Sequence, residues 1–169
     1  MDLKSRIRSI PGYPKEGIIF RDVTTLLKDG EAFKEAIDKM IEKIPGDFDK
    51  IVGVEARGFI VGAPMAYKLK KGFVPIRKPG KLPSEKISEE YELEYGTDSI
   101  EIHLDSINKG DKIILVDDLL ATGGTSESAI KLIEKLGGEV RALIFLMELE
   151  ELKARDKLKK YEVHSIIKY

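Results

Sequence analysis

The stretch that most restricts how this chain can fold is residues 113–125, which read IILVDDLLATGGT. Its four leading aliphatic residues predict a strand buried on both faces, as in the interior of a parallel sheet. Two carboxylates follow where that strand should end, and a loop of threonines and glycines comes next. Apolar residues then recur at helical spacing from Ala129 to Leu136, and Gly137-Gly138 ends them. The stretch therefore predicts a strand, an acidic tip, a Gly/Thr loop and a helix.

The residue types of this loop suit a phosphorylated sugar. The paired glycines let the backbone turn sharply and approach a ligand closely. N–H groups of the loop and of the helix start form a site for a phosphate dianion, to which the threonines add hydroxyl donors. The two carboxylates are acceptors for neighbouring hydroxyls of a ribose. An acidic pair beside an anion site thus indicates a ribose that carries a 5-phosphate.

Three other interpretations of this stretch are weaker. A Walker A loop needs lysine after the glycines, where this chain has Thr125, and the G-x-G-x-x-G dinucleotide motif is absent. An ordinary strand-to-helix turn with Asp and Thr as caps is the remaining alternative. The whole thirteen-residue pattern favours a ligand site, because a cap does not need two acids and two threonines around two glycines.

The run DDLLATGGT resembles the phosphoribosyl-pyrophosphate-binding motif of type I phosphoribosyltransferases, in the form found in adenine phosphoribosyltransferases. The resemblance implies that Asp117 and Asp118 hold the ribose hydroxyls. It also implies that the following loop wraps the 5-phosphate; the residues of that loop are Ala121, Thr122, Gly123, Gly124 and Thr125.

A second strand, loop and helix come earlier, at residues 50–54, 55–58 and 59–69. Ligands of open parallel sheets bind at the carboxyl ends of strands, so we expect this loop to lie near the acidic tip. Its residue types alone favour a solvated ion pair between Glu55 and Arg57. The run EARGF resembles the pyrophosphate loop of the same family, which implies that Glu55, Ala56 and Arg57 bind pyrophosphate and that Arg57 assists catalysis.

A basic loop follows a third short strand at residues 73–76. Arg77, Lys78 and Lys81 stand there among turn residues, which indicates a mobile loop that binds anions, although such a charge run is commonly only solvated. We expect these three cations to reach pyrophosphate. Many relatives carry a further basic residue where this chain has Pro79, so the sequence leaves open which cation makes the contact.

A base-binding hood is indicated by residues 17–22, GIIFRD, which resemble the hood of the adenine enzymes. By that resemblance Phe20 stacks on the purine, the main chain of Ile19 and Arg21 reads its edge, and Leu149 covers its other face. From residue type alone, Phe20 is a core residue.

A β-hairpin is predicted by two alternating runs, 91–95 and 99–104, around a turn at 96–98. Its piece LEYG resembles the flexible catalytic loop of the family, where the carboxylate approaches N7 of the base and the tyrosine covers the transition state. The resemblance assigns these roles to Glu94 and Tyr95; without it, both are exposed hairpin residues.

The alternation of strands and helices predicts an α/β fold: a doubly wound, mainly parallel sheet flanked by helices, with a β-hairpin flexible flap and a small N-terminal hood. We expect one phosphoribosyltransferase domain over residues 1–169, with the hood at 1–27 and the flap at 77–104. The remaining predictions are helices at 2–10, 31–44 and 153–160, a strand at 140–147 and an edge strand at 163–167.

Composition excludes several classes of function. The formal net charge of −1 argues against electrostatically driven nucleic-acid binding and against a polybasic membrane anchor. With no cysteine there is no disulfide framework and no thiolate nucleophile. No apolar run approaches membrane-spanning length and no signal core is present, so we expect a cytoplasmic protein.

The family resemblance implies transfer of 5-phosphoribosyl from phosphoribosyl pyrophosphate to adenine, giving AMP and pyrophosphate. Mg²⁺ would enter with the substrate, held mainly by phosphoribosyl pyrophosphate and water and not directly by the protein. The family also implies a homodimer, with the helix after Arg57 as an interface. The alternatives are a phosphoribosyltransferase for xanthine, hypoxanthine or a pyrimidine, and a non-catalytic regulator that senses phosphoribosyl pyrophosphate.

Overall fold

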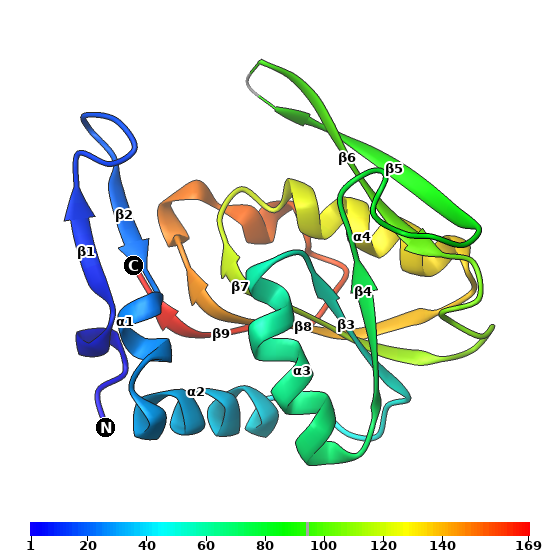
Figure 1. Ribbon diagram of the computed structural model, residues 1–169, viewed down its shortest axis with the longest axis horizontal. Helices are drawn as coiled ribbons and strands as arrows, with labels where there is room; N and C mark the ends of the chain where they lie inside the picture. Colours follow the sequence, from blue (N-terminus) through cyan, green and yellow to red (C-terminus); the bar gives the residue numbers. More distant parts are fainter. Residues whose placement is uncertain (94) are drawn as a thin grey trace.

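In the computed structural model, which describes residues 1–93 and 95–169, a central sheet of five parallel strands is covered by helices on both faces (Figure 1). The strand order is β4-β3-β7-β8-β9, and every neighbouring pair is parallel. The strands are β3 Lys50–Val54, β4 Gly72–Ile76, β7 Lys112–Leu120, β8 Glu139–Glu148 and β9 Val163–Lys168. The α-helices are α1 Thr24–Leu27, α2 Gly30–Glu42, α3 Arg57–Leu69 and α4 Gly124–Lys135. The predicted α/β sheet and its edge strand at 163–167 are confirmed.

The aliphatic run that opens β7 is buried on both sides because successive side chains of a strand point to opposite faces. Ile114 and Val116 pack in the core formed with α2 and α3. Ile113 and Leu115 pack in the second core, formed with α4. A central strand flanked by helices needs apolar residues at consecutive positions, which is why this run shows no polar alternation.

The helix before β3 begins where local sequence favours a start, and the helix after β3 begins earlier than the sequence indicated. Asp29 caps α2, and its carboxylate accepts hydrogen bonds from the N–H groups of Glu31 (3.1 Å) and Ala32 (3.2 Å). The helix expected from residue 59 begins two residues earlier, at Arg57. Arg57 therefore belongs to the first turn of α3, which anchors its backbone at the end of β3.

The N-terminal segment departs from the helix expected at residues 2–10. Only a 3₁₀ turn, η1 Lys4–Arg6, forms there, and the chain continues as β1 Arg8–Pro11. β1 pairs with β2, Ile19–Asp22, in an antiparallel two-stranded sheet that stands beside the end of β9 (Figure 1). Leu3 and Ile7 are buried in either arrangement, so their spacing could not separate a helix from a turn followed by a strand.

The predicted hairpin is present, but its turn lies elsewhere. β5 Lys86–Leu93 pairs with β6 Gly96–His103, and the register sets Leu93 opposite Gly96. The residues expected in the turn, 96–98, therefore belong to β6. Gly96 is the first residue of β6, and its φ of 110° is a conformation that glycine adopts readily. Glu94 lies outside the described residues.

The hairpin rests on α4 and directs its tip away from the sheet (Figure 1). Ile100 and Ile102 of β6 are fully buried in the core that α4 shares with the sheet. This packing fixes the base of the hairpin, while Tyr95 near its tip is 88% exposed.

The segment after β8 is more irregular than the helix expected at 153–160. It consists of two 3₁₀ turns, η2 Glu150–Leu152 and η3 Ala154–Lys157, with Lys153 between them at a φ of 54°. A residue in the left-handed region interrupts helical hydrogen bonding, which explains why the charged stretch does not continue as one helix.

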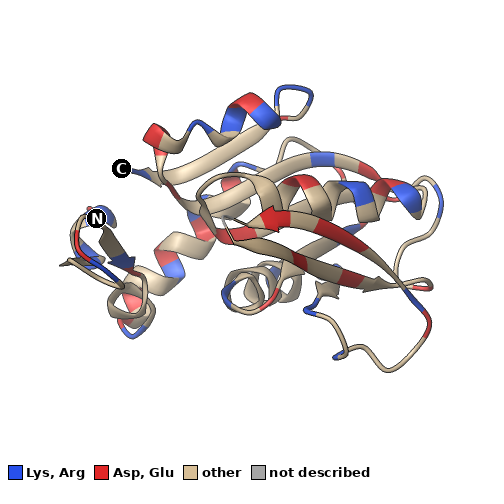
Figure 2. Ribbon diagram, turned by 90° about the horizontal axis from the view of Figure 1, so that it is seen from above, with Lys and Arg blue, Asp and Glu red and all other residues tan. Residues whose placement is uncertain are grey.

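Charges of both signs are distributed over the surface. In Figure 2, blue and red segments are interspersed along the helices, whereas the strands of the hairpin carry mainly red, acidic segments. Within residues 1–93 and 95–169, no helix is long and apolar enough to cross a membrane.

The contact between α3 and the sheet depends on two glycines that face Phe73, Gly53 of β3 and Gly62 of α3. A Cβ on Gly62 would lie 2.6 Å from Phe73 Cε1 and 2.9 Å from Val116 Cγ2. We expect Gly62→Ala to lower the free energy of unfolding by about 1–3 kcal/mol through overpacking. Gly30→Ala is the matched control, because nothing lies within 4 Å of its Cβ position. Denaturant titration of both variants tests this, and a Gly62→Ala protein as stable as wild type would contradict it.

Candidate active site

The carboxyl ends of β3 and β7 meet in a cavity of about 230 Å³. Parallel neighbours end at the same edge of a sheet, so the two loops that the sequence singled out come together here. The residues predicted to bind phosphoribosyl pyrophosphate that line this cavity are Glu55, Ala56, Arg57, Lys78, Asp117, Asp118 and Thr125. The structure thus brings the acidic tip, the EARGF loop and one cation of the basic loop to one site.

The acidic pair lies within β7 and not beyond its end. The strand was expected to stop at Val116, but its ladder with β8 continues to Leu120. Asp117 and Asp118 therefore project to opposite sides of the strand. Asp118 is buried, and Asp117 is half-buried against Gly58, where a Cβ would lie 2.9 Å from its Oδ1 atom. Rigid strand backbone, and not a loop, positions both carboxylates.

The Gly/Thr loop leads directly into the N-terminus of α4. Gly123 is the cap residue with a φ of 89°, a conformation that glycine adopts without strain. A Cβ there would also lie only 3.2 Å from the Cβ of Ala154. The first N–H groups of α4 have no partner within the helix and carry its positive dipole end, which suits an anion. Thr125 lines the cavity, whereas Thr122 is exposed outside its lining.

Arg57 is paired with one of the carboxylates. Its Nε atom donates to Oδ2 of Asp118 over 2.6 Å, in a contact that joins the first turn of α3 to β7. The guanidinium is about half exposed, and the carboxylate is 7% exposed. A ligand with both hydroxyl and phosphate groups would therefore compete for each partner of this ion pair.

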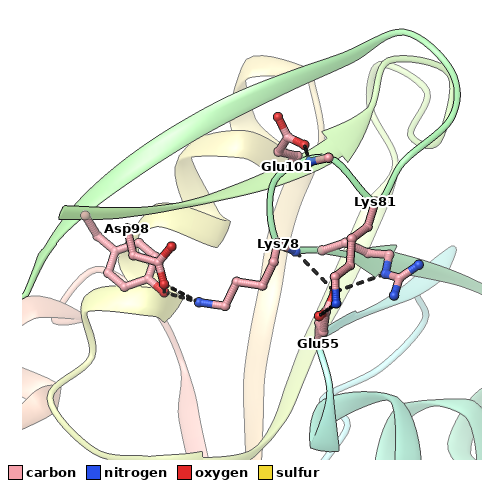
Figure 3. A network of polar contacts seen from close by, with 8 residues as sticks. Glu55, Lys78, Lys81, Asp98 and Glu101 are labelled. Carbon is pink, nitrogen blue, oxygen red and sulfur yellow. Dashed lines mark hydrogen bonds and ion pairs between the residues drawn. The ribbon is translucent and has the colours of Figure 1, made fainter.

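The basic loop is held by carboxylates from two elements (Figure 3). Glu55 accepts from Arg77 Nε (3.0 Å) and Lys81 Nζ (2.9 Å). Lys78 Nζ donates to Oδ2 of Asp98 (2.5 Å), on β6. Hydrogen bonds from Lys81, then from the Lys78 N–H and Arg77, lower the pKa of Glu55 against the opposing effect of burial. The loop is thus tied both to the end of β3 and to the hairpin.

A second, larger cavity of about 790 Å³ lies between the hood and the segment after β8. Ile19, Arg21 and Leu149, three of the four residues expected around a purine, line it. Phe20 is not among its lining residues. Phe20 is half-buried and meets Tyr13 edge-to-face, with 5.3 Å between ring centroids. The assignment of Phe20 to base stacking stays a prediction.

Sequence reasoning missed two tyrosines of these cavities. Tyr169 lines the larger cavity, and the guanidinium of Arg21 lies 4.1 Å from its ring centroid. Tyr91 lines the smaller cavity and accepts a hydrogen bond from Lys78 Nζ (2.7 Å). Tyr169 follows an edge strand with no motif around it, so no sequence signal marked it. The alternation of the hairpin could have marked Tyr91 as inward-facing.

Comparison with known proteins agrees with this geometry. The phosphoribosyl transferase domain family matches residues 23–168. The adenine phosphoribosyltransferase of Acetivibrio thermocellus is 60% identical over 100% of both chains, and that of Halothermothrix orenii is 62% identical over 99% of both. The chain belongs to the adenine phosphoribosyltransferase family. The crystal structure of the Thermoanaerobacter pseudethanolicus adenine phosphoribosyltransferase superposes with a TM-score of 0.96 at 54% identity, covering 99% of this chain and 98% of the other.

In this adenine phosphoribosyltransferase fold, the environment of the acidic pair favours a neutral Asp117. Burial raises the pKa of Asp117 well above its ordinary value, and the neighbouring charge of Asp118 raises it further. The N–H group of Asp118 donates to Asp117 Oδ1 (2.8 Å) and Arg57 lies nearby, but both together only partly offset these effects. Two adjacent carboxylates in a confined site resist simultaneous ionisation.

A raised pKa makes the stability of the fold depend on pH. The contribution of such an acid is present below its unfolded pKa and is lost as pH rises through the higher folded pKa. We therefore expect Asp117→Asn to become progressively more stable than wild type as pH rises from about 4 towards neutral. Melting temperatures measured across this range test this, with Asp105→Asn, an exposed acid after β6, as the control. A difference that does not change with pH would contradict the raised pKa.

Proposed function

We propose that this chain transfers the 5-phosphoribosyl group of phosphoribosyl pyrophosphate to N9 of adenine, releasing AMP and pyrophosphate. The observation that carries the proposal is the cavity where the acidic pair, Arg57 and the N-terminus of α4 converge. Relatives named adenine phosphoribosyltransferase align over the full chain. The Saccharomyces cerevisiae enzyme, 40% identical over 98% of this chain and 96% of its own with a TM-score of 0.92, was crystallised with adenine.

The sugar and its 5-phosphate are assigned to β7 and the loop after it. Asp117 and Asp118 accept hydrogen bonds from the ribose hydroxyls. The 5-phosphate lies over the loop 121–125, where backbone N–H groups and the dipole of α4 favour a dianion. Thr125 supports this assignment, because its side chain stands on the cavity at the first turn of α4.

Pyrophosphate is assigned to the EARGF and basic loops. Arg57 offers a planar fork of donors suited to phosphate oxygens once Asp118 has turned to the ribose. Arg77 and Lys81 are held by Glu55, and Lys78 by Asp98 and Tyr91, so each can be released to an incoming anion when it exchanges these partners. These cations would stabilise the charge that develops on departing pyrophosphate.

Adenine is assigned to the cavity between the hood and the segment after β8. Leu149, Ile19 and Arg21 line this cavity, and the backbone of Ile19 and Arg21 is proposed to read the edge of the base. Phe20 is proposed to stack on the base after its ring turns from Tyr13.

The transfer is a displacement at the anomeric carbon. The bond from this carbon to the pyrophosphate oxygen breaks, and its electron pair leaves with pyrophosphate. N9 of adenine forms the new bond from the opposite face, which inverts the configuration, and the N9 proton leaves the base. Glu94 is proposed to polarise the purine through N7 or to handle this proton, and Tyr95 to cover the site when the hairpin closes and excludes water.

Mg²⁺ is expected to accompany phosphoribosyl pyrophosphate. Among residues 1–93 and 95–169, no group of three or more His, Asp or Glu side chains could cage a metal ion. We propose that Mg²⁺ is held mainly by phosphoribosyl pyrophosphate and water, and that the carboxylates of this edge would contact it only through those waters. When bound, Mg²⁺ would neutralise charge on the leaving pyrophosphate.

A homodimer through α3 is also proposed. An apolar groove of about 470 Å³ lies between α2 and α3, lined partly by Phe33, Ile37 and Pro64. Tyr67 at its rim is 88% exposed, and Ile60, two turns earlier on α3, is 40% exposed. A second copy covering this face would bury apolar surface that a monomer leaves in water.

Incubation of the protein with Mg²⁺, phosphoribosyl pyrophosphate and one base at a time tests the proposed function. We expect AMP and pyrophosphate from adenine, detected by chromatography, and no nucleotide from hypoxanthine, xanthine or the pyrimidines. Product from a different base would overturn the assignment of adenine. Binding of phosphoribosyl pyrophosphate without product from any base would favour a sensor.

The stacking role of Phe20 has its own test. Phe20→Leu keeps an apolar side chain of similar volume but removes the flat ring, whereas Phe20→Tyr keeps the ring. We expect Phe20→Leu to raise the KM for adenine about 5- to 13-fold, the range that loss of one stacking contact of about 1–1.5 kcal/mol would produce, and Phe20→Tyr to behave like wild type. Steady-state kinetics measures both, and equal KM values for all three proteins would leave Phe20 as a packing residue.

A further inference from the structure

A partly buried ionic cluster, in which the carboxylate is buried and the guanidinium is 42% exposed, lies next to both proposed substrate cavities without lining either of them. Glu148, the last residue of β8, is 3% exposed and accepts hydrogen bonds from two other elements. Arg155 of η3 donates to it through Nε (3.1 and 3.2 Å) and Nη2 (2.9 Å), and Ser165 of β9 donates through its hydroxyl (2.6 Å). Arg155 Nη1 also donates to the carbonyl of Val163 (2.9 Å). The cluster thus joins β8, η3 and β9.

One side of this cluster holds the wall of the base cavity. Leu149 follows Glu148 directly, and its N–H group donates to the carbonyl of Leu120 at the end of β7 (3.0 Å). The N–H group of Tyr169 donates to the carbonyl of Glu148 (2.9 Å), which continues the ladder to β9. Leu149 therefore has little freedom to move while Glu148 stays bound.

The other side holds the proposed phosphate loop. Ala154 precedes Arg155, is 1% exposed and packs against Gly123. A Cβ on Gly123 would lie 3.3 Å from the Ala154 carbonyl oxygen, so the two backbones are in direct apposition. In Figure 1 the orange segment after β8 accordingly lies beside the loop between β7 and α4.

We propose that Glu148, Arg155 and Ser165 form a positioning cluster that sets the spacing between the base wall at Leu149 and the phosphate loop at Gly123. The inference rests on the proposed function, because it supposes one ligand that spans the two cavities. Such a ligand binds tightly only if its two sites are held at the right separation beforehand. The three residues line neither cavity and act through their chain neighbours.

An ionic cluster suits this role better than apolar packing does. A buried ion pair adds little net stability, but its hydrogen bonds fix direction as well as distance. Burial raises the pKa of Glu148, yet the bonds from Arg155 and Ser165 together outweigh burial and hold the pKa below its ordinary value. The carboxylate is thus charged when it binds the guanidinium fork.

The test compares a spanning ligand with its two parts. Glu148→Gln, Arg155→Lys and Ser165→Ala are made, and the dissociation constants of AMP, adenine and ribose 5-phosphate are measured by direct binding well below each melting temperature. Asp111→Asn is the control. It weakens the ion pair with Lys50 (2.6 Å), which lies at the amino ends of β3 and β7, away from both cavities.

We expect Glu148→Gln to weaken the binding of AMP about tenfold. The binding of adenine and of ribose 5-phosphate should each weaken no more than about twofold. Arg155→Lys should cause an intermediate loss of AMP affinity, because it keeps the charge but loses the forked pair of donors. Ser165→Ala should cause the smallest loss. Asp111→Asn should lower the melting temperature without selective loss of AMP.

Two results would overturn this inference but leave the proposed function intact. One is unchanged AMP affinity in Glu148→Gln, and the other is an equal loss for AMP and for its parts, which marks a merely structural role. Wild-type protein that converts no adenine and binds neither AMP nor its parts would overturn the proposed function, and the inference with it.

Discussion

Parallel pairing of β7 with β3 on one side and β8 on the other is the constraint on which the rest of the structure depends. Parallel strands need crossovers, and those crossovers place α3 and α4 on opposite faces of the sheet. The same pairing sets every strand-to-helix loop at one edge, where the cavity with Arg57 and the acidic pair lies. Because the β7–β8 ladder runs on to Leu120, this edge consists of strand backbone and is rigid.

The backbone at the site is rigid, whereas its charged side chains form ion pairs with one another that a substrate can replace. Arg57 pairs with Asp118, Lys81 and Arg77 share Glu55, and Lys78 bonds to the hairpin. Most of the cationic partners in these pairs are a third or more exposed, so solvent screens them and each pair contributes little to stability. Their exchange for substrate groups therefore costs little, which suits a site that must bind and release a highly charged ligand.

Close packing limits what the chain tolerates around this site. Phe73 fills the space above Gly53 and Gly62, and Ala154 lies against Gly123. In each place a side chain or backbone occupies the volume that a Cβ would need. The glycines of this fold thus serve two purposes, since some permit a turn and others permit contact between layers. Gly123 does both, at the loop proposed to hold the 5-phosphate, and Gly137 does both where it meets Lys109.

Sequence alone determined the features that depend on local pattern. The aliphatic run and the Gly/Thr loop predicted β7 and α4, and the EARGF and DDLLATGGT runs predicted the residues that converge at the cavity. Local pattern failed where two conformations bury the same residues: Leu3 and Ile7 suit a helix as well as a turn and strand. It also failed at the hairpin, where the register of Leu93 with Gly96 and not glycine content sets the turn.

Tertiary structure decided everything that depends on pairing between distant segments. It extended β7 through the acidic pair, matched Arg57 with Asp118, and brought Tyr169 to the cavity beside Leu149. Hydrophobic periodicity predicts which residues are buried, because the buried face of a helix or strand follows from the periodicity of that single element. Which buried or charged groups meet depends on strand order and register, and these arise only when elements far apart in the chain pack together.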